Sequence, residues 1–428
     1  MHHFLYKGDE LHCEDVPIRD IAREIGTPCY IYSHATLSNH FKVFDAAFKD
    51  VPHLTCFSVK ANSNIAILKL FGSLGGGVDI VSGGELYRVR KAGIPPERIV
   101  YSGVGKTVEE IDYALREDIL MFNIESTQEL EELNRRAAAK DTKARISLRV
   151  NPDIDPNTHP YISTGMKKNK FGISIENAMK AYEKAGSLRN IEIVGIDCHI
   201  GSQLTEVTPF VDALKRIRIL IERLRQSGIQ IRYLDLGGGL GIVYDQEVPP
   251  QPHEYASAIL RELDNVQCTL IFEPGRVIVG NAGILVTKVL YTKRSPAKNF
   301  VVTDGAMNDL IRPSLYGAYH YIQPVVKTQR EAQIVDVVGP ICESGDFLAK
   351  DRGLPTLCAG DYLAVMSAGA YGFTMSSNYN SRRRAAEVLV KDDRYFVIRE
   401  RESWEDLVRP EAIPDFLLDE HASTSTGG

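Results

Sequence analysis

The stretch Leu54-Thr-Cys-Phe-Ser-Val-Lys60-Ala-Asn-Ser-Asn64 joins a short apolar run to a lysine and a polar turn. The run is typical of a buried β-strand, and Lys60 stands at its carboxyl end. Neighbouring side chains at such a position remove water from the ammonium group, so we expect burial to lower the pKa of Lys60. A neutral lysine amine is the nucleophile of Schiff-base chemistry, which makes Lys60 the first candidate for a catalytic residue.

The pattern of this stretch recurs along residues 54–276, where β-rich runs alternate with amphipathic segments. The predicted strands are Leu54–Val59, Val78–Val81, Arg98–Tyr101, Ile119–Phe122, Arg145–Val150, Ile193–Cys198, Arg232–Leu236 and Thr269–Phe272. Eight strands, each followed by a helical segment, predict a (β/α)8 TIM-type barrel. A doubly wound open sheet is the alternative. The barrel is favoured because polar residues follow nearly every strand instead of gathering at one crevice.

The segments between the strands carry helix signals. Helices are predicted over Thr107–Arg116, Ser126–Ala139 and Val207–Gln226. The first begins with a threonine cap followed by glutamates, and the second begins Ser-Thr-Gln-Glu, which resembles a capping box. The third is long and amphipathic, as a helix on the outside of a barrel would be.

Polar groups lie in the predicted strands or close after them. In chain order they are Lys60, Asp79, Ser102, Asn123, Glu125, Arg149, Asn151, His199 with Ser202, the Gly237–Gly239 run, and Glu273. The carboxyl ends of barrel strands converge on one mouth, where such barrels hold their active sites. The sequence therefore predicts an active site at that mouth.

The chain changes character after Gly280. Short β-rich runs separated by Gly, Pro, Asn and Asp predict an antiparallel β-domain, with strands at Gly283–Thr292, Asn299–Asp304, Gln333–Val338, Asp361–Met366 and Tyr395–Arg399. We expect three parts: residues 1–35, whose short strands pack with the β-domain; the barrel, residues 36–278; and the β-domain, residues 279–428. A disordered tail is expected at Ser423–Gly428.

Composition excludes several classes of protein. A chain of 428 residues is long enough for two domains, and its net charge of −6 includes no extended basic block, so nucleic acid is not an expected partner. No apolar run approaches the roughly 18 residues of a membrane span, and the N-terminus lacks the apolar core of a signal peptide. Seven cysteines without a CxxC pair indicate reduced thiols, a cytoplasmic location and no metal site.

The residues of the mouth suggest a cofactor. The run Gly237-Gly-Gly-Leu-Gly241 is either a tight turn or a phosphate site, to which Ser202 would add a hydroxyl. Glu273 is either a salt-bridge partner of Arg276 or the carboxylate that holds a protonated pyridine nitrogen. His199 is either a core histidine with its hydrogen bonds satisfied or a ring that stacks on a flat cofactor. Together with Lys60, these groups describe bound pyridoxal 5′-phosphate, and a carboxylate at the ring nitrogen favours a decarboxylase over a racemase.

At this point the chain resembles a known family, the alanine-racemase-fold decarboxylases that use pyridoxal phosphate. The motifs that carry the resemblance are Phe57-Ser-Val-Lys60-Ala-Asn62, His199-Ile-Gly-Ser-Gln203, Gly237-Gly-Gly239, Glu273-Pro-Gly-Arg276 and Gly339-Pro-Ile-Cys-Glu-Ser-Gly-Asp346. Within that family, Met166-Lys-Lys-Asn-Lys-Phe-Gly172 and Cys342-Glu-Ser-Gly-Asp346 are most similar to the diaminopimelate branch. The resemblance covers nearly the whole chain in order, and it implies decarboxylation of meso-2,6-diaminopimelate to L-lysine, the last step of lysine biosynthesis.

The resemblance also implies roles for particular residues. Lys60 would bind the cofactor covalently and His199 would stack on its ring. The other cofactor ligands would be Ser202, Gly239, Glu273, Gly275, Arg276 and Tyr371. The distal carboxylate of the substrate would be held by Arg276, Arg312 and Tyr316, with Tyr371 closing over the site, and its distal ammonium by Glu343. Cys342 would donate a proton. The family places Cys342 and Glu343 across a homodimer interface, so that two subunits share each active site.

Three alternatives remain open at the level of sequence. Another basic amino acid, such as ornithine, arginine or carboxynorspermidine, could be the substrate of the decarboxylase, although two arginines and Glu343 favour diaminopimelate. An amino acid racemase is disfavoured by Glu273. A non-catalytic carrier of pyridoxal phosphate would resemble the barrel alone, and the β-rich region beyond residue 280 argues against it.

Overall fold

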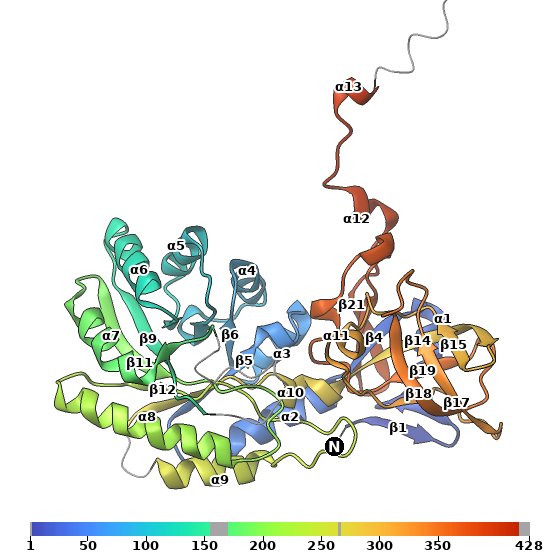
Figure 1. Cartoon of the computed structure of the whole chain (residues 1–428), viewed down its shortest axis with the longest axis horizontal. Helices are drawn as coiled ribbons and strands as arrows, with labels where there is room; N and C mark the ends of the chain where they lie inside the picture. The colour runs from blue at the N-terminus through green and yellow to red at the C-terminus, as the bar shows by residue number, and fades with distance from the viewer. Residues whose placement is uncertain (1, 155–169, 264–266, 419–428) are drawn as a thin grey trace, which may run out of the picture.

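The computed structural model describes residues 2–154, 170–263 and 267–418. Two bodies lie side by side: a barrel with its surrounding helices and a β-domain that contains most of the chain beyond residue 283 (Figure 1). The segment between them is short, because α10 (Arg276–Val279) and a 3₁₀ turn lead directly from the last barrel strand into β14 (Gly283–Arg294).

Eight parallel strands form the barrel and confirm its prediction. They are β5 (His53–Ser58), β6 (Gly77–Ile80), β7 (Ile99–Tyr101), β8 (Met121–Ile124), β9 (Ala144–Asn151), β11 (Ile191–Asp197), β12 (Tyr233–Asp235) and β13 (Thr269–Phe272). Each pairs with the next in parallel, and β13 pairs with β5 to close the ring. The open-sheet alternative is therefore wrong.

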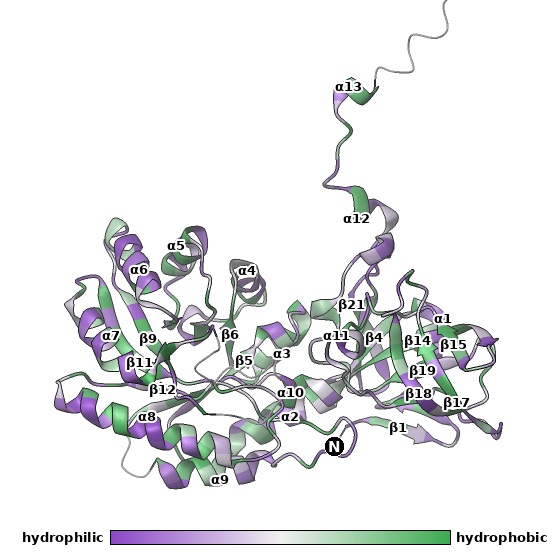
Figure 2. Cartoon of the chain, viewed as in Figure 1, coloured by the Kyte–Doolittle hydropathy of each residue, from purple (hydrophilic) through white to green (hydrophobic). Residues whose placement is uncertain are grey.

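Helices cover the outside of the barrel. They are α2 (His34–Ala46), α3 (Ile65–Ser73), α4 (Gly83–Lys91), α5 (Val108–Glu117), α6 (Thr127–Ala139), α7 (Ile175–Ser187), α8 (Thr208–Gln226) and α9 (Pro252–Glu262). Figure 2 shows α6 and α8 with mixed hydrophilic and hydrophobic stretches, as expected of helices with one face on the barrel and one on solvent. No helix in the described ranges is both long and apolar enough to cross a membrane.

The structure confirms the predicted cap at Thr107 and shows a different arrangement at Ser126. Thr107 and Glu110 form a reciprocal capping box at the start of α5. Ser126 accepts a hydrogen bond from the backbone N–H of Glu129, but the Glu129 carboxylate accepts from the Glu125 backbone N–H and from Lys106 instead of returning to Ser126. The buried Lys106 ammonium diverts the side chain, so α6 has a serine cap and only half of the predicted box.

The β-domain is more extensive than predicted. Its strands are β14, β15 (Asn299–Thr303), β16 (Ile322–Pro324), β17 (Ala332–Val338), β18 (Phe347–Pro355), β19 (Tyr362–Val365), β20 (Ala386–Lys391) and β21 (Arg394–Arg399). The sequence missed β16, β18 and β20. Most pairs are antiparallel, but β15 pairs with β17, and β20 with β4 (Cys29–Ser33), in parallel, so the sheet is mixed.

The ends of the chain lie on the side of the β-domain. Strands β1 (Phe4–Lys7), β2 (Glu10–Cys13) and β3 (Val16–Pro17) form a small sheet, α1 (Ile18–Ile25) follows, and β4 inserts between β14 and β20. Beyond β21 the chain leaves the body through α12 (Trp404–Val408), whose Trp404 ring lies 4.5 Å from the Arg383 guanidinium, and α13 (Asp415–Leu418), which stands away from both domains (Figure 1). The expected disorder of Ser423–Gly428 lies outside the described residues.

Aromatic packing fixes the end of β13, where the site begins. Phe48, which follows α2, stacks on Phe272 of β13 with ring centroids 3.9 Å apart, and Tyr255 of α9 meets Phe272 edge-on. The three rings are fully buried. Because interior packing of this density leaves little freedom to the backbone, the residue that follows Phe272, Glu273, enters the mouth from a fixed position.

Candidate active site

Lys60 lies in the 3₁₀ turn that follows β5, and its side chain opens onto the mouth with 35% exposure. Its Nζ atom lies 2.8 Å from Oδ2 of Asp79 at the end of β6. Partial burial opposes the ammonium form, but Asp79 and then Glu273 outweigh it and raise the pKa of Lys60 above its ordinary value. The expectation of a lowered pKa is therefore wrong, because strand order brings a carboxylate within hydrogen-bond distance of the amine.

Glu273 is buried at the end of β13. Its Oε1 accepts hydrogen bonds from Ser102 (3.2 Å) and from Asn123 (3.4 Å), which also donates to Asp235 (3.2 Å). Burial, followed by the charges of Asp235 and Asp79, raises the pKa of Glu273 well above its ordinary value. The salt bridge to Arg276 that the sequence left open does not form, since the Arg276 guanidinium turns instead to Ser202 and Tyr244.

Carboxyl groups outnumber cationic groups inside the mouth. Buried carboxyl groups come from the ends of five strands or the residues after them: Asp79, Glu125, Asp197, Asp235 and Glu273. The cations that face them are Lys60 and Arg149, which contacts Glu125 at 2.6 Å and Asp197 at 3.8 Å. Burial raises the pKa of Asp197 and of Glu273 well above the ordinary value, and a ligand with a cationic group would favour their ionised forms.

A glycine turn after β12 approaches His199 closely. Gly237 has a φ of +63°, and a Cβ there would lie 2.5 Å from Nδ1 of His199. The backbone N–H of Gly238 donates to that nitrogen (3.2 Å). Burial, with the charges of Arg149 and Lys60, lowers the pKa of His199 well below its ordinary value, so the ring is neutral and carries its proton on Nε2.

The backbone beside this turn forms a cradle without side chains. Gly239 has a φ of +127°, and a Cβ there would lie 2.8 Å from the carbonyl oxygen of Gly201. Ser202 and Gly275 flank it, and a Cβ on Gly275 would meet Ala61 and Ser58 at 3.1 Å. Glycine backbone has no Cβ to keep a ligand away from its N–H groups, so such a cradle suits an anion.

Tyr371 brings the β-domain to the mouth. Its backbone N–H donates to the carbonyl oxygen of Ala61 (2.8 Å), in the same turn as Lys60. The Arg276 guanidinium lies 5.0 Å from the centre of its ring. Amine, carboxyl group, neutral histidine and anion cradle thus meet in one place, and they fit pyridoxal 5′-phosphate, whose protonated ring nitrogen would favour the ionised form of Glu273.

A cavity of about 150 Å³ opens beside the cradle. It is lined by Gln203, Tyr244, Glu247, Arg276, Arg312, Tyr316, Ala318 and Tyr319. Arg276 and Arg312 are 5% and 6% exposed, yet among the described residues neither has a carboxylate within 4 Å. Their guanidinium groups instead lie 5.7 and 5.1 Å from the centre of the Tyr244 ring. Two buried cations without a carboxylate partner make this cavity a site for an anionic group.

The structure separates Cys342 and Glu343 from the other candidates. Both are exposed, on the loop between β17 and β18, and the backbone N–H of Cys342 donates to Asn380 (3.0 Å). No contact joins either side chain to Lys60 or to the cavity within the parts of the chain that are described. In the single chain they lie outside the site that the other candidates form.

Some residues of the site were missed by sequence reasoning. Asp235 lies inside the predicted strand Arg232–Leu236, as Asp79 lies inside Val78–Val81, and that position could have identified it. Tyr244 lies well beyond the end of β12, in the segment before α9, and His320 lies just before β16 in the β-domain; no pattern in the sequence marks either residue. The motif that ends at Gly172 lies partly outside the described residues; of its described part, Phe171 lies 4.8 Å from the Arg149 guanidinium and Gly172 donates to Glu125.

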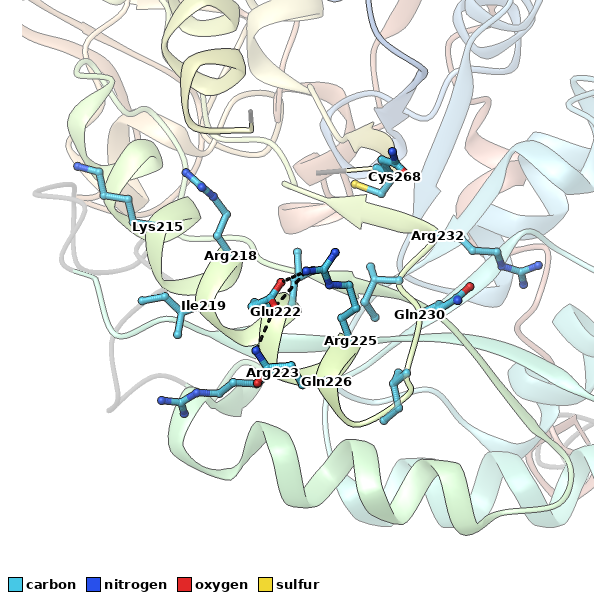
Figure 3. Close-up of a pocket in the computed structure, with 14 residues that line it drawn as sticks. Lys215, Arg218, Ile219, Glu222, Arg223, Arg225, Gln226, Gln230, Arg232 and Cys268 are labelled. Atoms are coloured by element: carbon cyan, nitrogen blue, oxygen red, sulfur yellow. Dashed lines mark hydrogen bonds and ion pairs between the residues drawn. The ribbon is translucent and has the colours of Figure 1, made fainter. Parts of the chain in front are cut away.

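A larger hollow, of about 1210 Å³, lies elsewhere on the barrel. Figure 3 shows it between the C-terminal half of α8 and the segments that enter β12 and β13, with Arg225 and Gln226 turned to Glu222. These are the amino ends of the strands, opposite the mouth. None of the candidate residues lines this hollow.

Comparison with known proteins is consistent with a site for pyridoxal phosphate. Residues 34–280 match the family model described as pyridoxal-dependent decarboxylase, pyridoxal binding domain. The chain is 53% identical to the diaminopimelate decarboxylase of Aquifex aeolicus over 406 residues. The aligned region covers 95% of this chain and 96% of that one. It is 54% identical over 415 residues to the enzyme of Vibrio cholerae, covering 96% and 99%.

A solved structure shares the architecture. The diaminopimelate decarboxylase of Helicobacter pylori, complexed with L-lysine, superposes with a TM-score of 0.89 at 44% identity, over 92% of this chain and 99% of that one. Similarity of this extent in sequence and in structure leaves one conclusion: the chain belongs to the pyridoxal-dependent decarboxylases and, among them, to the diaminopimelate decarboxylase family.

Proposed function

We propose that this protein binds pyridoxal 5′-phosphate and decarboxylates meso-2,6-diaminopimelate to L-lysine and CO2. The observation that carries the proposal is the pair of buried arginines, Arg276 and Arg312, in the cavity beside the mouth, with no carboxylate partner among the described residues. A substrate with a second carboxylate supplies that partner. Ornithine and arginine have no second carboxylate and would leave both guanidinium groups without one.

The barrel would hold the cofactor. When bound, pyridoxal phosphate accepts the electron pair that the departing CO2 leaves behind. Lys60 would bind it through Nζ, and Glu273 would hold a proton on the ring nitrogen. His199 would support the ring from one face as a neutral imidazole. Ser202, Gly239, Gly275 and Arg276 would receive the phosphate, with Tyr371 beside them.

The cavity would hold the end of the substrate that does not react. Arg312 and Arg276 would bind the distal carboxylate by charge-assisted hydrogen bonds, and the Tyr316 hydroxyl would add a donor. Holding that end fixes the other, reacting end against Lys60. Positioning of this kind is a major source of rate enhancement in enzymes.

We further propose that the enzyme is a homodimer with shared active sites. Cys342 would donate a proton to the carbon that loses CO2, and Glu343 would bind the distal ammonium, both from the second subunit. Their exposure in the single chain supports this arrangement. On this view residues 36–278 carry the cofactor, and residues 279–428, with the first 35, supply the groups that reach across. Seven free cysteines support a cytoplasmic location.

Release of CO2 from a panel of amino acids tests the function. Purified protein with added cofactor is given meso-, LL- and DD-diaminopimelate, lysine, ornithine and arginine in separate reactions. We expect release from meso-diaminopimelate with L-lysine as the product. Faster release from ornithine or arginine would assign the enzyme to another branch, and racemisation without CO2 would assign it to another class.

A further inference from the structure

His320 is a buried histidine behind the distal-carboxylate cavity, and the proposed mechanism gives it no role. It has no exposed surface and lies just before β16, at the back of the cavity wall. Arg352 of β18 donates to its carbonyl oxygen (2.8 Å), and Tyr244 meets its ring edge-on at 5.4 Å. The backbone and ring of His320 are therefore held from two sides.

The hydrogen bonds of the ring define its protonation. Nδ1 lies 2.9 Å from the carbonyl oxygen of Met366, an acceptor only, so Nδ1 carries the proton. Nε2 is then a lone-pair acceptor, and it lies 3.3 Å from Nε of Arg312, a donor only. Burial, with the charge of Arg312, lowers the pKa of His320 to about 3, so the ring stays neutral at physiological pH.

The bond to His320 occupies only one of the nitrogens of Arg312. Nε faces the imidazole, which leaves the two terminal Nη groups for the cavity that Arg312 lines. The Arg312 guanidinium lies 5.1 Å from the centre of the Tyr244 ring and 5.8 Å from that of Tyr316, and these two rings restrict its movement. A long arginine side chain loses much rotamer freedom when it is fixed this way before a ligand arrives, which strengthens binding.

We propose that His320 is the positioning residue of the distal-carboxylate site: its Nε2 accepts a hydrogen bond from Nε of Arg312 and directs the two terminal nitrogens of that guanidinium toward the carboxylate. This role rests on the proposed function of the cavity. His320 does not contact the substrate, and it acts only through Arg312.

Two substitutions at His320 separate this role from simple packing. His320→Gln places an amide oxygen near the position of Nε2 and keeps an acceptor for Arg312. His320→Asn places its amide near Nδ1, so it keeps the donor to Met366 and loses the acceptor. We expect His320→Asn to raise KM for meso-diaminopimelate about tenfold or more, as for the loss of a hydrogen bond to a charged group, with a much smaller change in kcat. His320→Gln should recover most of the loss.

Binding of L-lysine gives a readout that does not depend on turnover. The product retains the carboxylate that did not react, so calorimetric titration of the holoenzyme with L-lysine should show the same order. We expect the affinity to fall from wild type to His320→Gln and then to His320→Asn. His53→Asn is the matched control, because His53 pairs with Asp45 near the amino end of β5, away from the cavity. It should leave KM and lysine affinity unchanged.

A double-mutant cycle decides whether His320 acts through Arg312. In an Arg312→Ala background, His320→Asn should have no further effect on KM, whereas additive losses would overturn the proposal. Should His320→Asn fail to fold, Arg312→Lys gives the second comparison: it keeps the charge but has no Nε at this position, and an unchanged KM would overturn the proposal. If wild-type enzyme prefers a substrate without a distal carboxylate, the proposed function fails first and independently.

Discussion

At the scale of the residue, Glu273 and Lys60 illustrate how the fold sets the chemistry. Each stands at the end of a barrel strand, and neighbouring strands place Asp79 and Asp235 close to them. Asp79 and Glu273 hold Lys60 as an ammonium, while burial, with the charges of Asp235 and Asp79, raises the pKa of Glu273. A cationic cofactor ring in the mouth would lower the pKa of Glu273 again, because an opposite charge favours the ionised carboxylate.

Glu273→Gln should reduce kcat much more than it reduces cofactor affinity. The carboxylate stabilises charge mainly while CO2 leaves, so its loss raises the barrier of that step. Loss of one preorganised interaction typically costs about 2.7–4 kcal/mol, which corresponds to about a 100- to 1000-fold lower kcat. Steady-state kinetics and a cofactor titration measure the two effects separately. An unchanged kcat with weaker cofactor binding would make Glu273 a structural residue.

Asp309 predicts a pH dependence of stability. It is buried, and burial raises its pKa to about 7, whereas the pKa of aspartate in an unfolded chain is about 3.9. The folded protein therefore binds an extra proton between about pH 4 and 7, so this contribution to stability is present at low pH and is lost as the pH rises through 7. Asp309→Asn removes the ionisation and should raise Tm by about 2 °C or more at pH 8 but not at pH 4.5.

The matched control for this change is Asp393→Asn in the exposed turn before β21. It should give the same difference from wild type at both pH values. Equal shifts for the Asp309 variant at pH 4.5 and pH 8 would show that Asp309 is ionised throughout or contributes nothing.

At the scale of the element, α11 (Arg312–Tyr316) carries the distal-carboxylate site. It is a short helix that presents its first and last residues, Arg312 and Tyr316, to the same cavity. Its Ser314 hydroxyl donates to the carbonyl oxygen of Gly345 (2.5 Å), which ties it to the loop that contains Cys342 and Glu343. One element thus connects the cavity with the residues that we expect to reach the second subunit.

Arg312→Ala and Tyr316→Phe should raise KM for diaminopimelate while the cofactor stays bound. Both residues would grip the end of the substrate that does not react, so their loss weakens binding more than the chemical step. We expect about a tenfold effect for each lost hydrogen bond to the charged carboxylate. The absorbance of the bound cofactor is the internal control. Unchanged KM in both variants would mean that the distal carboxylate binds elsewhere.

The elements also show what the sequence could and could not predict. The barrel strands were predicted to within about two residues, because a parallel strand buried on both faces is a short apolar run whatever its neighbours are. Strand β18, with Lys350, Asp351, Arg352 and Gly353 at its centre, has no such run. It is a strand because it pairs with β17, a long-range contact that no local pattern encodes.

The features of the site also differ in whether the sequence alone could predict them. Residues at strand ends, such as Lys60, Asp79 and Glu273, could be predicted because barrel topology brings those ends together. The raised pKa of Lys60 and the bond from Arg312 to His320 depend on distances between segments far apart in the chain. Those distances follow only from the folded structure.

At the scale of the whole molecule, the separation of Lys60 from Cys342 predicts a shared site. Lys60→Ala and Cys342→Ala homodimers should each be nearly inactive. In a mixed dimer one mouth carries both defects and the other carries neither, so dissociating and reassociating the two variants should restore up to about a quarter of wild-type activity for random pairing. If no activity returns although native mass spectrometry shows mixed dimers, each subunit uses its own Cys342.

The central claim is that the mouth of the barrel at Lys60 is the active site, and borohydride reduction of the holoenzyme tests it most directly. Reduction fixes the cofactor on whichever lysine holds it, and peptide mass mapping of the full chain identifies that residue. The account predicts a pyridoxyl group on Lys60, and none on Lys60→Arg protein that keeps its fold by circular dichroism. A pyridoxyl group on Lys106 or Lys170 in the wild-type protein would contradict the account.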